Sequence, residues 1–455
     1  MATRAGGASA FWAARQQTQV PVGCFAPCGR GERQTILMLQ ARIDTRGSFG
    51  AGLVPCDDRS TSRRKPHMTS TVSLGIDAER IALLPAAIKA DIEADKFDGA
   101  VVLVARRGEI VLHEAVGYAD RAGNRPAQRD SVFVTMSIFK QMVAAAVLQR
   151  IDRGEIAFTT KVADVIPEYA ANGKGATTVA DLLLHKAGLP LGTPGIPPEV
   201  IGDIEAVTAI VCGFVPQSVP GTTISYAAVV GHGVLAEIVR RLDGGHRAFG
   251  RILKEDLIEP LGMVDTSLGF GLREDQIDRV VPIAVKDLSQ QLLSPELLHG
   301  AGKVAATPGL EVPAGSAYTT AHDWFRFAEA CRLGGELDGN RILSPAVLRF
   351  ATTIATSDLT NSLWDYAQNM RGWPAMPANL SPGFYVRGTG ITSHAFGQLS
   401  SPGTFGGIGT GSNCFWVDPE RELTYVFLSA GLIEDSYSWE RHQRYADLVQ
   451  SSVVE

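Results

Sequence analysis

The stretch that decides the fold of this chain is Val134–Arg150, with the sequence VTMSIFKQMVAAAVLQR. Apolar residues recur in it at helical spacing, and Ser137 stands where the expected helix begins. Lys140 follows three residues later, so its amine and the Ser137 hydroxyl are expected on one helix face. The N–H groups of a first helical turn lack partners within the helix and stabilise negative charge. The stretch therefore predicts a nucleophile, a base and half of an oxyanion hole.

The Ser-x-x-Lys spacing alone is a weak signal, because it also occurs at Ser62–Lys65. That second copy lies in the basic run SRRK and has no apolar periodicity around it. Taken alone, Ser137 would fit a helix cap and Lys140 a surface lysine equally well. The surrounding pattern favours Ser137 as the nucleophile.

Composition and charge limit the class of protein. The chain has 455 residues, of which 45% are hydrophobic and 20% charged, as in ordinary globular enzymes. No apolar run approaches the roughly 18 residues of a membrane span, so we expect a soluble protein without a membrane partner. Residues 1–67 carry a net charge of +6 and residues 68–455 a net charge of −12. The acidic body argues against nucleic acid as a partner.

The first 73 residues are interpreted as a poorly ordered basic extension. They have no secretory signal and no lasting hydrophobic period, although organellar targeting and translation from Met68 both stay open. Cys24, Cys28 and His67 suggest metal ligands, but the spacing fits no zinc pattern, and we predict no metal ion.

Three further cysteines are scattered through the body of the chain, at positions 212, 331 and 414. They resemble small buried hydrophobic residues of a reducing compartment, which predicts a cytoplasmic location.

Sheet signals occur at both ends of the body, with helical patterns between them. The expected elements are a helix capped by Asp77, a hairpin at Gly99–His113, strands at Asn413–Val417 and Leu423–Ser429, and a final helix at Ser438–Val449. This order predicts an α+β fold, with an antiparallel sheet flanked by helices and an inserted, mainly helical subdomain at roughly 150–315.

Several motifs follow one another in a definite order around Ser137. They are the hairpin Gly99–His113, Asp181–Pro190, Tyr226, Gly335–Gly339, and Phe405–Gly411 running into Phe415–Pro419. This order resembles the serine β-lactamase and penicillin-binding-protein superfamily, nearest to class C β-lactamases and family VIII carboxylesterases. The resemblance implies a β-lactamase/transpeptidase-like serine hydrolase domain over residues 74–455.

The resemblance also implies roles for single residues. Ser137 would be the acylated nucleophile and Lys140 its partner. Tyr226 would serve as general base for acylation and as acid for the leaving group, with Lys140 helping the phenol to ionise. The N–H groups of Ser137 and Thr410 would form the oxyanion hole. The resemblance gives His185 no chemical role, so we expect this residue to be structural.

Two positions depart from the family pattern. The second motif normally ends in Asn, which can bind a substrate amide, and here Ala228 stands in its place. The third motif, expected to bind substrate, reads Gly407-Ile408-Gly409 where the family begins with Lys, His or Trp. A cation at the first place would bind the carboxylate of a penicillin or peptide. Both losses favour esters, whose better leaving group needs less polarisation.

We therefore predict a serine hydrolase that cleaves small carboxylic esters through an acyl-enzyme on Ser137, without cofactor or metal. Acyl transfer to an acceptor other than water stays open. One alternative is a β-lactamase or D-alanyl-D-alanine carboxypeptidase, in which Arg371 or Arg387 replaces the missing cation. Another is a catalytically silent binding protein of the same fold. Acyl and alcohol specificity and the oligomeric state are not predicted.

Overall fold

The structure is a computed structural model, which describes residues 71–286, 293–356 and 358–454. All of these residues belong to the unit Lys65–Glu455. The predictions for Ser62–Lys65, for Cys24, Cys28 and His67, and for nearly all of the extension at 1–73 lie outside the described residues.

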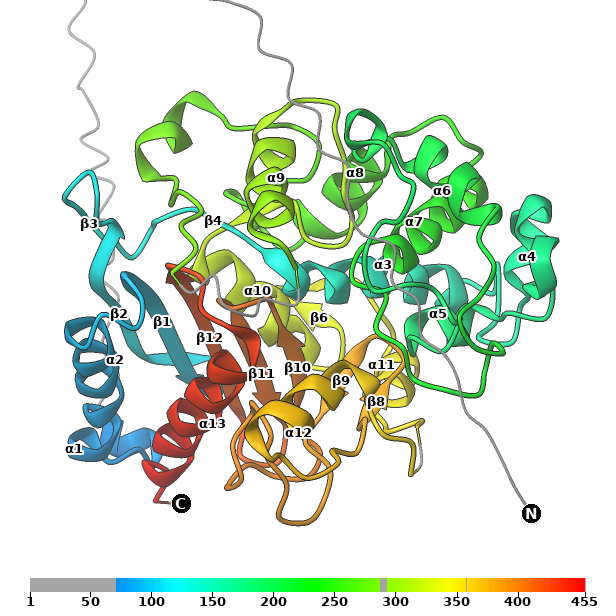
Figure 1. Ribbon diagram of the computed structural model, residues 1–455. Coiled ribbons are helices and arrows are strands. Elements are labelled where there is room, and N and C mark those ends of the chain that lie inside the picture. The colour runs from blue at the N-terminus through cyan, green and yellow to red at the C-terminus, as the bar shows by residue number, and fades with distance from the viewer. Residues whose placement is uncertain (1–70, 287–292, 357, 455) are drawn as a thin grey trace, which may run out of the picture. The chain divides into compact units, whose positions relative to one another are not determined.

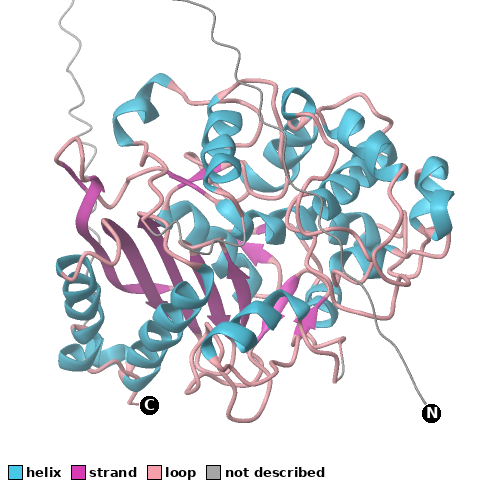
Figure 2. Ribbon diagram, viewed as in Figure 1, coloured by secondary structure: helices cyan, strands magenta, loops and turns pink. Residues whose placement is uncertain are grey.

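An eight-stranded antiparallel sheet forms the centre of the described unit (Figure 1; Figure 2). Its strand order is β3-β2-β1-β12-β11-β10-β9-β8, so the first hairpin pairs with the last strand of the chain. The strands of this sheet are β1 (Gly99–Arg106), β2 (Glu109–Asp120), β3 (Arg125–Pro126), β8 (Leu380–Ser381), β9 (Phe384–Val386), β10 (Phe405–Ile408), β11 (Cys414–Asp418) and β12 (Leu423–Ala430). Two small pairs stand apart from it, formed by β4 (Phe133–Val134) with β5 (Tyr318–Thr319) and β6 (Glu336–Leu337) with β7 (Asn340–Arg341).

Helices flank the sheet and fill much of the chain between β4 and β8. The α-helices are α1 (Ala78–Ile81), α2 (Leu83–Glu93), α3 (Phe139–Asp152), α4 (Val162–Val165), α5 (Val179–Leu183), α6 (Ile204–Cys212), α7 (Val230–Leu242), α8 (Phe249–Leu253), α9 (Pro295–Ala306), α10 (Ala321–Arg332), α11 (Pro345–Ala351), α12 (Asp365–Arg371) and α13 (Asp435–Ser451). Short 3₁₀ turns are η1 (Thr71–Leu74), η2 (Met136–Ile138), η3 (Pro167–Gly173), η4 (Pro198–Val200), η6 (Glu274–Arg279) and η7 (Ser362–Trp364), and η5 (Lys254–Ile258) is a π-helical turn.

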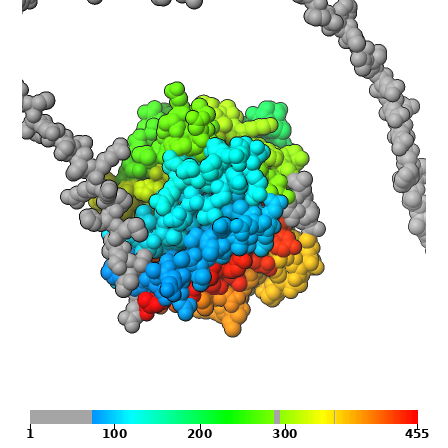
Figure 3. Space-filling model, turned by 90° about the vertical axis from the view of Figure 1, so that its left-hand side faces the viewer, coloured from blue at the N-terminus to red at the C-terminus, as the bar shows by residue number. Residues whose placement is uncertain are grey.

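The core lies on both faces of the sheet, because its central strands are buried on both sides. Along β1, Val101 and Leu103 join a cluster with α3, α7 and α10, whereas Val102 and Val104 join a second cluster with α1, α2 and α13. Alternate residues of a strand point to opposite faces, which produces this division. Figure 3 shows the first described helices beside α13, in blue and red.

Helix α3 is the central helix of the first cluster. Its residues from Phe139 to Arg150 are all buried, including the polar side chains of Lys140, Gln141, Gln149 and Arg150. Helix α7 packs against α3. Tyr226 lies just before α7, and this packing brings it to the N-terminal end of α3. None of the helices in the described ranges is long and apolar enough to span a bilayer.

The predicted antiparallel sheet flanked by helices is confirmed. Asp77 caps α1, where its carboxylate accepts hydrogen bonds from the Glu79 N–H (2.9 Å) and the Arg80 N–H (3.1 Å). The second strand of the hairpin, β2, is longer than predicted and extends to Asp120. Its residues are mostly half-buried, so apolar and polar positions do not alternate clearly enough in the sequence to mark its end. Residues 150–315 hold α4–α9 and none of the described strands of the sheet; their standing as a separate subdomain stays a prediction.

Candidate active site

Ser137 lies in the turn η2 that leads directly into α3, rather than in the α-helix itself. The preceding residue, Met136, has φ +48°, a left-handed conformation that is rare for a side chain of this kind. Strained residues persist only where their surroundings hold them, and they concentrate at functional sites. The structure therefore aims the Ser137 side chain at the cost of a strained backbone.

Neighbouring segments hold this strained turn on both sides. The Asn413 amide donates to the carbonyl oxygens of Val134 (2.9 Å) and Thr135 (3.0 Å). The Thr135 hydroxyl donates to the Gly315 carbonyl oxygen at 3.0 Å. A methyl group on Gly315 would lie 2.6 Å from the Met136 carbonyl carbon, so the close approach requires glycine.

The Lys140 amine is fully buried and contacts the predicted nucleophile. Its Nζ donates to the Ser137 Oγ and to the Ala314 carbonyl oxygen, both at 2.9 Å. No carboxylate of the described residues takes part, and burial alone lowers the pKa of Lys140 from 10.5 to about 7. A substantial fraction of this lysine is therefore neutral at physiological pH and can accept a proton.

Tyr226 stands on the other side of Lys140, with Nζ 5.2 Å from the centre of its ring. Burial of the phenol raises its pKa well above the ordinary value of 10, and a nearby Tyr385 adds to this effect. The hydrogen bond with Ser137 acts in the opposite direction but does not outweigh burial. The phenolate is thus disfavoured in the free protein, and Tyr226 is better suited to donate a proton than to remove one.

Gly407 does not open toward a substrate, because the side chain of Gln141 fills the space above it. A methyl group on Gly407 would lie 2.0 Å from Gln141 Oε1 and 2.9 Å from the Phe415 ring. The Gln141 amide is held there by a hydrogen bond from Nε2 to the Gly383 carbonyl oxygen, at 3.0 Å. The place where the family carries a cation is therefore occupied by a neutral amide from α3.

The rest of the third motif reaches the predicted catalytic residues. Ile408 lines the pocket around Ser137. Gly409 lies against the turn before the nucleophile, since a methyl group on it would be 3.0 Å from the Met136 Cβ. Thr410 follows Gly409 in the chain, and the part of its N–H in an oxyanion hole stays a prediction. The structure thus brings together the predicted residues Ser137, Lys140 and Tyr226 and the segment 407–409.

These residues enclose a narrow catalytic pocket with about 10 Å³ of free space, close to what one water molecule needs. Its walls are formed by Ser137, Lys140, Gln141, Leu183, His185, Tyr226, His232, Leu380, Gly383, Phe384, Tyr385 and Ile408. Burial and the nearby Lys140 lower the pKa of His185 to about 3 and that of His232 well below 6.5, so both imidazoles are neutral. Lys140 is therefore the one residue with a formal charge among these described lining residues.

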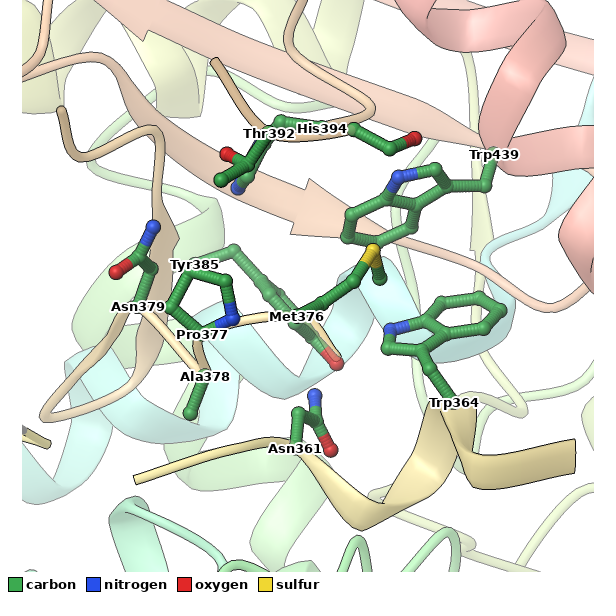
Figure 4. A pocket seen from close by; sticks show the side chains of 11 residues that line it. Asn361, Trp364, Met376, Pro377, Ala378, Asn379, Tyr385, Thr392, His394 and Trp439 are labelled. Atoms are coloured by element: carbon green, nitrogen blue, oxygen red, sulfur yellow. The ribbon is translucent and has the colours of Figure 1, made fainter. Parts of the chain in front are cut away.

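A second small pocket lies behind Tyr385, which lines both (Figure 4). Its wall combines the rings of Trp364, Trp439 and His394 with polar side chains such as those of Asn361 and Asn379. Figure 4 shows the Tyr385 hydroxyl directed toward Asn361, whose hydrogen bond opposes the rise in the pKa of Tyr385 that burial causes. Tyr385 therefore forms part of the wall of both pockets.

The two arginines considered as replacement cations are engaged elsewhere. Arg387 is buried, and its guanidinium donates to four backbone carbonyl oxygens between residues 388 and 398. Arg371 donates to the Ser436 hydroxyl at 2.7 Å and to the Glu440 carboxylate at 2.8 Å. Neither residue lines the catalytic pocket, so the alternative that relies on them finds no support.

Sequence reasoning missed Gln141, His232 and Tyr385 as parts of the site. Gln141 carried a usable signal, since it is a polar residue directly after Lys140 in an otherwise apolar helix. Tyr385 carried none, because β8 and β9 have two and three residues and leave no period in the sequence.

Comparisons with known proteins show the family of the chain. A family model described as Beta-lactamase matches residues 84–449. The esterase/beta-lactamase LipL of Mycobacterium tuberculosis is 27% identical over 362 residues, which cover 74% of this chain and 78% of LipL. A crystal structure of a penicillin-binding-protein homologue from Caulobacter crescentus is 26% identical, with a TM-score of 0.66, and covers 83% of this chain and 99% of its own. A family VIII carboxylesterase structure is 25% identical, with a TM-score of 0.68 and the same coverage.

Proposed function

The chain belongs to the beta-lactamase family, and we propose that it is a serine hydrolase that cleaves small carboxylic esters through an acyl-enzyme on Ser137. The observation that carries this proposal is the catalytic pocket, which combines a Lys140–Ser137 hydrogen bond of 2.9 Å with the absence of a second charged group among its described lining residues. The similarity to an esterase/beta-lactamase and to a family VIII carboxylesterase supports the same activity.

Acylation begins with neutral Lys140, which takes the proton of the Ser137 hydroxyl. The Ser137 Oγ then forms a bond to the ester carbonyl carbon, and the carbonyl oxygen becomes an oxyanion. The N–H groups of Ser137 and Thr410 stabilise this oxyanion, and losing one such donor typically slows a reaction by on the order of a hundredfold or more. The lowered pKa of Lys140, to about 7, supports its role as the base.

Tyr226 donates a proton to the departing alkoxide when the bond to the alcohol oxygen breaks. The raised pKa of its phenol supports this role rather than that of the general base expected from the family pattern. The protonated Lys140 returns a proton to Tyr226, so the acyl-enzyme step leaves both groups as they began. Lys140 then takes a proton from a water molecule that attacks the acyl carbon, and it returns this proton to the Ser137 Oγ as the bond to the acyl group breaks and the carboxylic acid leaves.

The pocket favours an ester over a penicillin or a peptide. Those substrates carry a carboxylate that requires a cation, and Gln141 occupies the space above Gly407 where the family provides one. Ala228 is buried and its side chain has no hydrogen-bonding group to hold a substrate amide. A neutral ester requires neither contact.

We further propose a cytoplasmic protein that acts on small molecules, without nucleic acid or membrane partners. The cysteines Cys212, Cys331 and Cys414 are free and buried, as is common in reducing compartments.

Turnover of p-nitrophenyl esters and of nitrocefin tests the proposal. We expect the wild type to hydrolyse the short esters and to leave nitrocefin intact, and we expect Ser137→Ala to abolish ester turnover. Ser62→Ala is the matched control, since Ser62 begins the other Ser-x-x-Lys sequence, and this variant should retain activity. Nitrocefin turnover comparable to ester turnover would contradict the argument from Gly407 and Gln141 and favour a β-lactamase.

A further inference from the structure

Two histidines stand beside the proposed catalytic residues without a part in the mechanism. His185 and His232 both line the catalytic pocket, with 8% and 1% of their surfaces exposed. The His185 ring is 4.6 Å from the Tyr226 ring and 5.5 Å from the His232 ring, measured between centroids. The two imidazoles thus continue the polar wall that begins with Lys140 and Tyr226.

The backbone of His185 is built to hold this position. It has φ +54°, a left-handed conformation that costs energy for a residue with a side chain. The His185 carbonyl oxygen accepts a hydrogen bond of 2.8 Å from the Ser225 N–H, directly before Tyr226. This backbone hydrogen bond ties the turn at His185 to the segment that carries Tyr226.

Both imidazoles retain an unused polar atom. The Nδ1 atoms of His185 and His232 are buried and have no hydrogen-bond partner among the described residues. Burying an unpaired polar atom is destabilising, and in native proteins such atoms generally meet a water molecule or a ligand. Both residues line the same pocket, which makes a group bound there a candidate partner for these atoms.

The free space in the pocket and the charge state of the two imidazoles limit which chemical group can bind beside them. About 10 Å³ is free, which accommodates one water-sized group. Both imidazoles are neutral, because their pKa values lie below the ordinary range, and a neutral imidazole offers one N–H and one bare nitrogen. A hydroxyl group both donates and accepts, so it can pair with either nitrogen, whereas a carboxylate accepts only and an ammonium donates only.

We propose that His185 and His232 form a hydroxyl-binding subsite of the catalytic pocket. The inference rests on the proposed ester hydrolysis and adds the group that the pocket recognises beside the scissile bond. Two sources share this chemistry: the water that releases the acyl group from Ser137, and a hydroxyl carried by the substrate next to its ester.

The experiment compares His232→Leu, which keeps apolar volume, with His232→Asn, which restores a hydrogen-bonding group near Nδ1. His246→Leu, at an exposed position, is the control. The paired substrates are p-nitrophenyl butyrate and p-nitrophenyl 3-hydroxybutyrate. The readouts are kcat and KM for each ester and the fraction of acyl-enzyme measured by intact mass after rapid quenching.

If the subsite holds the hydrolytic water, His232→Leu lowers kcat about three- to tenfold for both esters and acyl-enzyme accumulates. If it holds a substrate hydroxyl, kcat/KM for the hydroxy ester falls by the same factor relative to the plain ester. In either case His232→Asn recovers part of the loss and His246→Leu behaves as the wild type.

Unchanged kinetics in His232→Leu would overturn the proposal. Equal losses of acylation in both His232 variants, without accumulated acyl-enzyme, would also overturn it and indicate a structural role. Failure of the proposed function gives a different result, because the wild type would then form no acyl-enzyme with either ester.

Discussion

Replacement of Lys140 by methionine should make the protein more stable at neutral pH while it removes activity. The amine is fully buried without a carboxylate partner among the described residues, and burial lowers its pKa from 10.5 to about 7. Between these two pH values the unfolded chain binds more protons than the folded chain, so the unfolding free energy of the wild type rises with pH. The thioether of the variant would not titrate, and it has a similar length and no charge to bury.

The magnitude follows from the same pKa. The difference between 10.5 and about 7, at about 1.4 kcal/mol per pKa unit, corresponds to about 5 kcal/mol. The stability gain of Lys140→Met is therefore largest below pH 7 and declines by about 1.4 kcal/mol per pH unit toward pH 10.5. Loss of the hydrogen bonds to Ser137 and Ala314 lowers the unfolding free energy of the variant by about 1–3 kcal/mol at every pH, so it does not change the slope of the difference with pH.

Urea unfolding of the wild type and of Lys140→Met at several values between pH 6.5 and 9.5 measures this slope. Other groups titrate in the same range, but they are common to both proteins and cancel in the difference. Lys89→Met, at an exposed position of α2, controls for the exchange of an ammonium for a thioether. A difference in unfolding free energy that stays constant with pH would refute the reasoning that burial holds Lys140 near neutrality.

Three further results are expected. The value of kcat/KM for a p-nitrophenyl ester should rise about tenfold per pH unit below pH 7 and level off above it, because neutral Lys140 is the base; a flat profile from pH 5.5 to 8.5 would contradict that role. Gly407→Ala should lower the unfolding free energy by about 1–3 kcal/mol through overpacking against Gln141. Gly403→Ala, where a methyl group meets open space, should be near neutral in the same urea titration. Asn413→Ala should cost about 1–3 kcal/mol and most of the esterase activity, since two buried carbonyl oxygens beside Ser137 lose their donor, and full activity at normal stability would contradict this.

The sequence predicted best those parts of the fold that depend on local residue patterns. The hairpin at Gly99–His113 begins with a continuous apolar run and a Gly turn, and the helix after Ser137 has apolar residues at helical spacing. The motif order around Ser137 indicated the beta-lactamase family, which the matched family model confirms. Ser137 and Lys140 were predicted together because three residues separate them in the chain.

Features that depend on distant contacts were not accessible from the sequence. The Gln141 side chain fills the space above Gly407 because β10 lies against the start of α3. In the sequence these two residues are far apart, so nothing there connects the missing cation at Gly407 with the presence of Gln141. The division of roles between Lys140 and Tyr226 depends on how deeply each group is buried, which opposes ionisation of both. Sequence spacing indicated the positions of these groups but not their protonation.

Intact-mass analysis of the rapidly quenched reaction with p-nitrophenyl butyrate tests whether Ser137 carries an acyl group during ester hydrolysis. We expect one added butyryl group, located on the peptide that contains Ser137. We also expect that a fluorophosphonate blocks this addition and that Ser137→Ala abolishes it, whereas Ser62→Ala does not. Ester turnover that persists in Ser137→Ala, or a butyryl group located on another residue, would contradict the account.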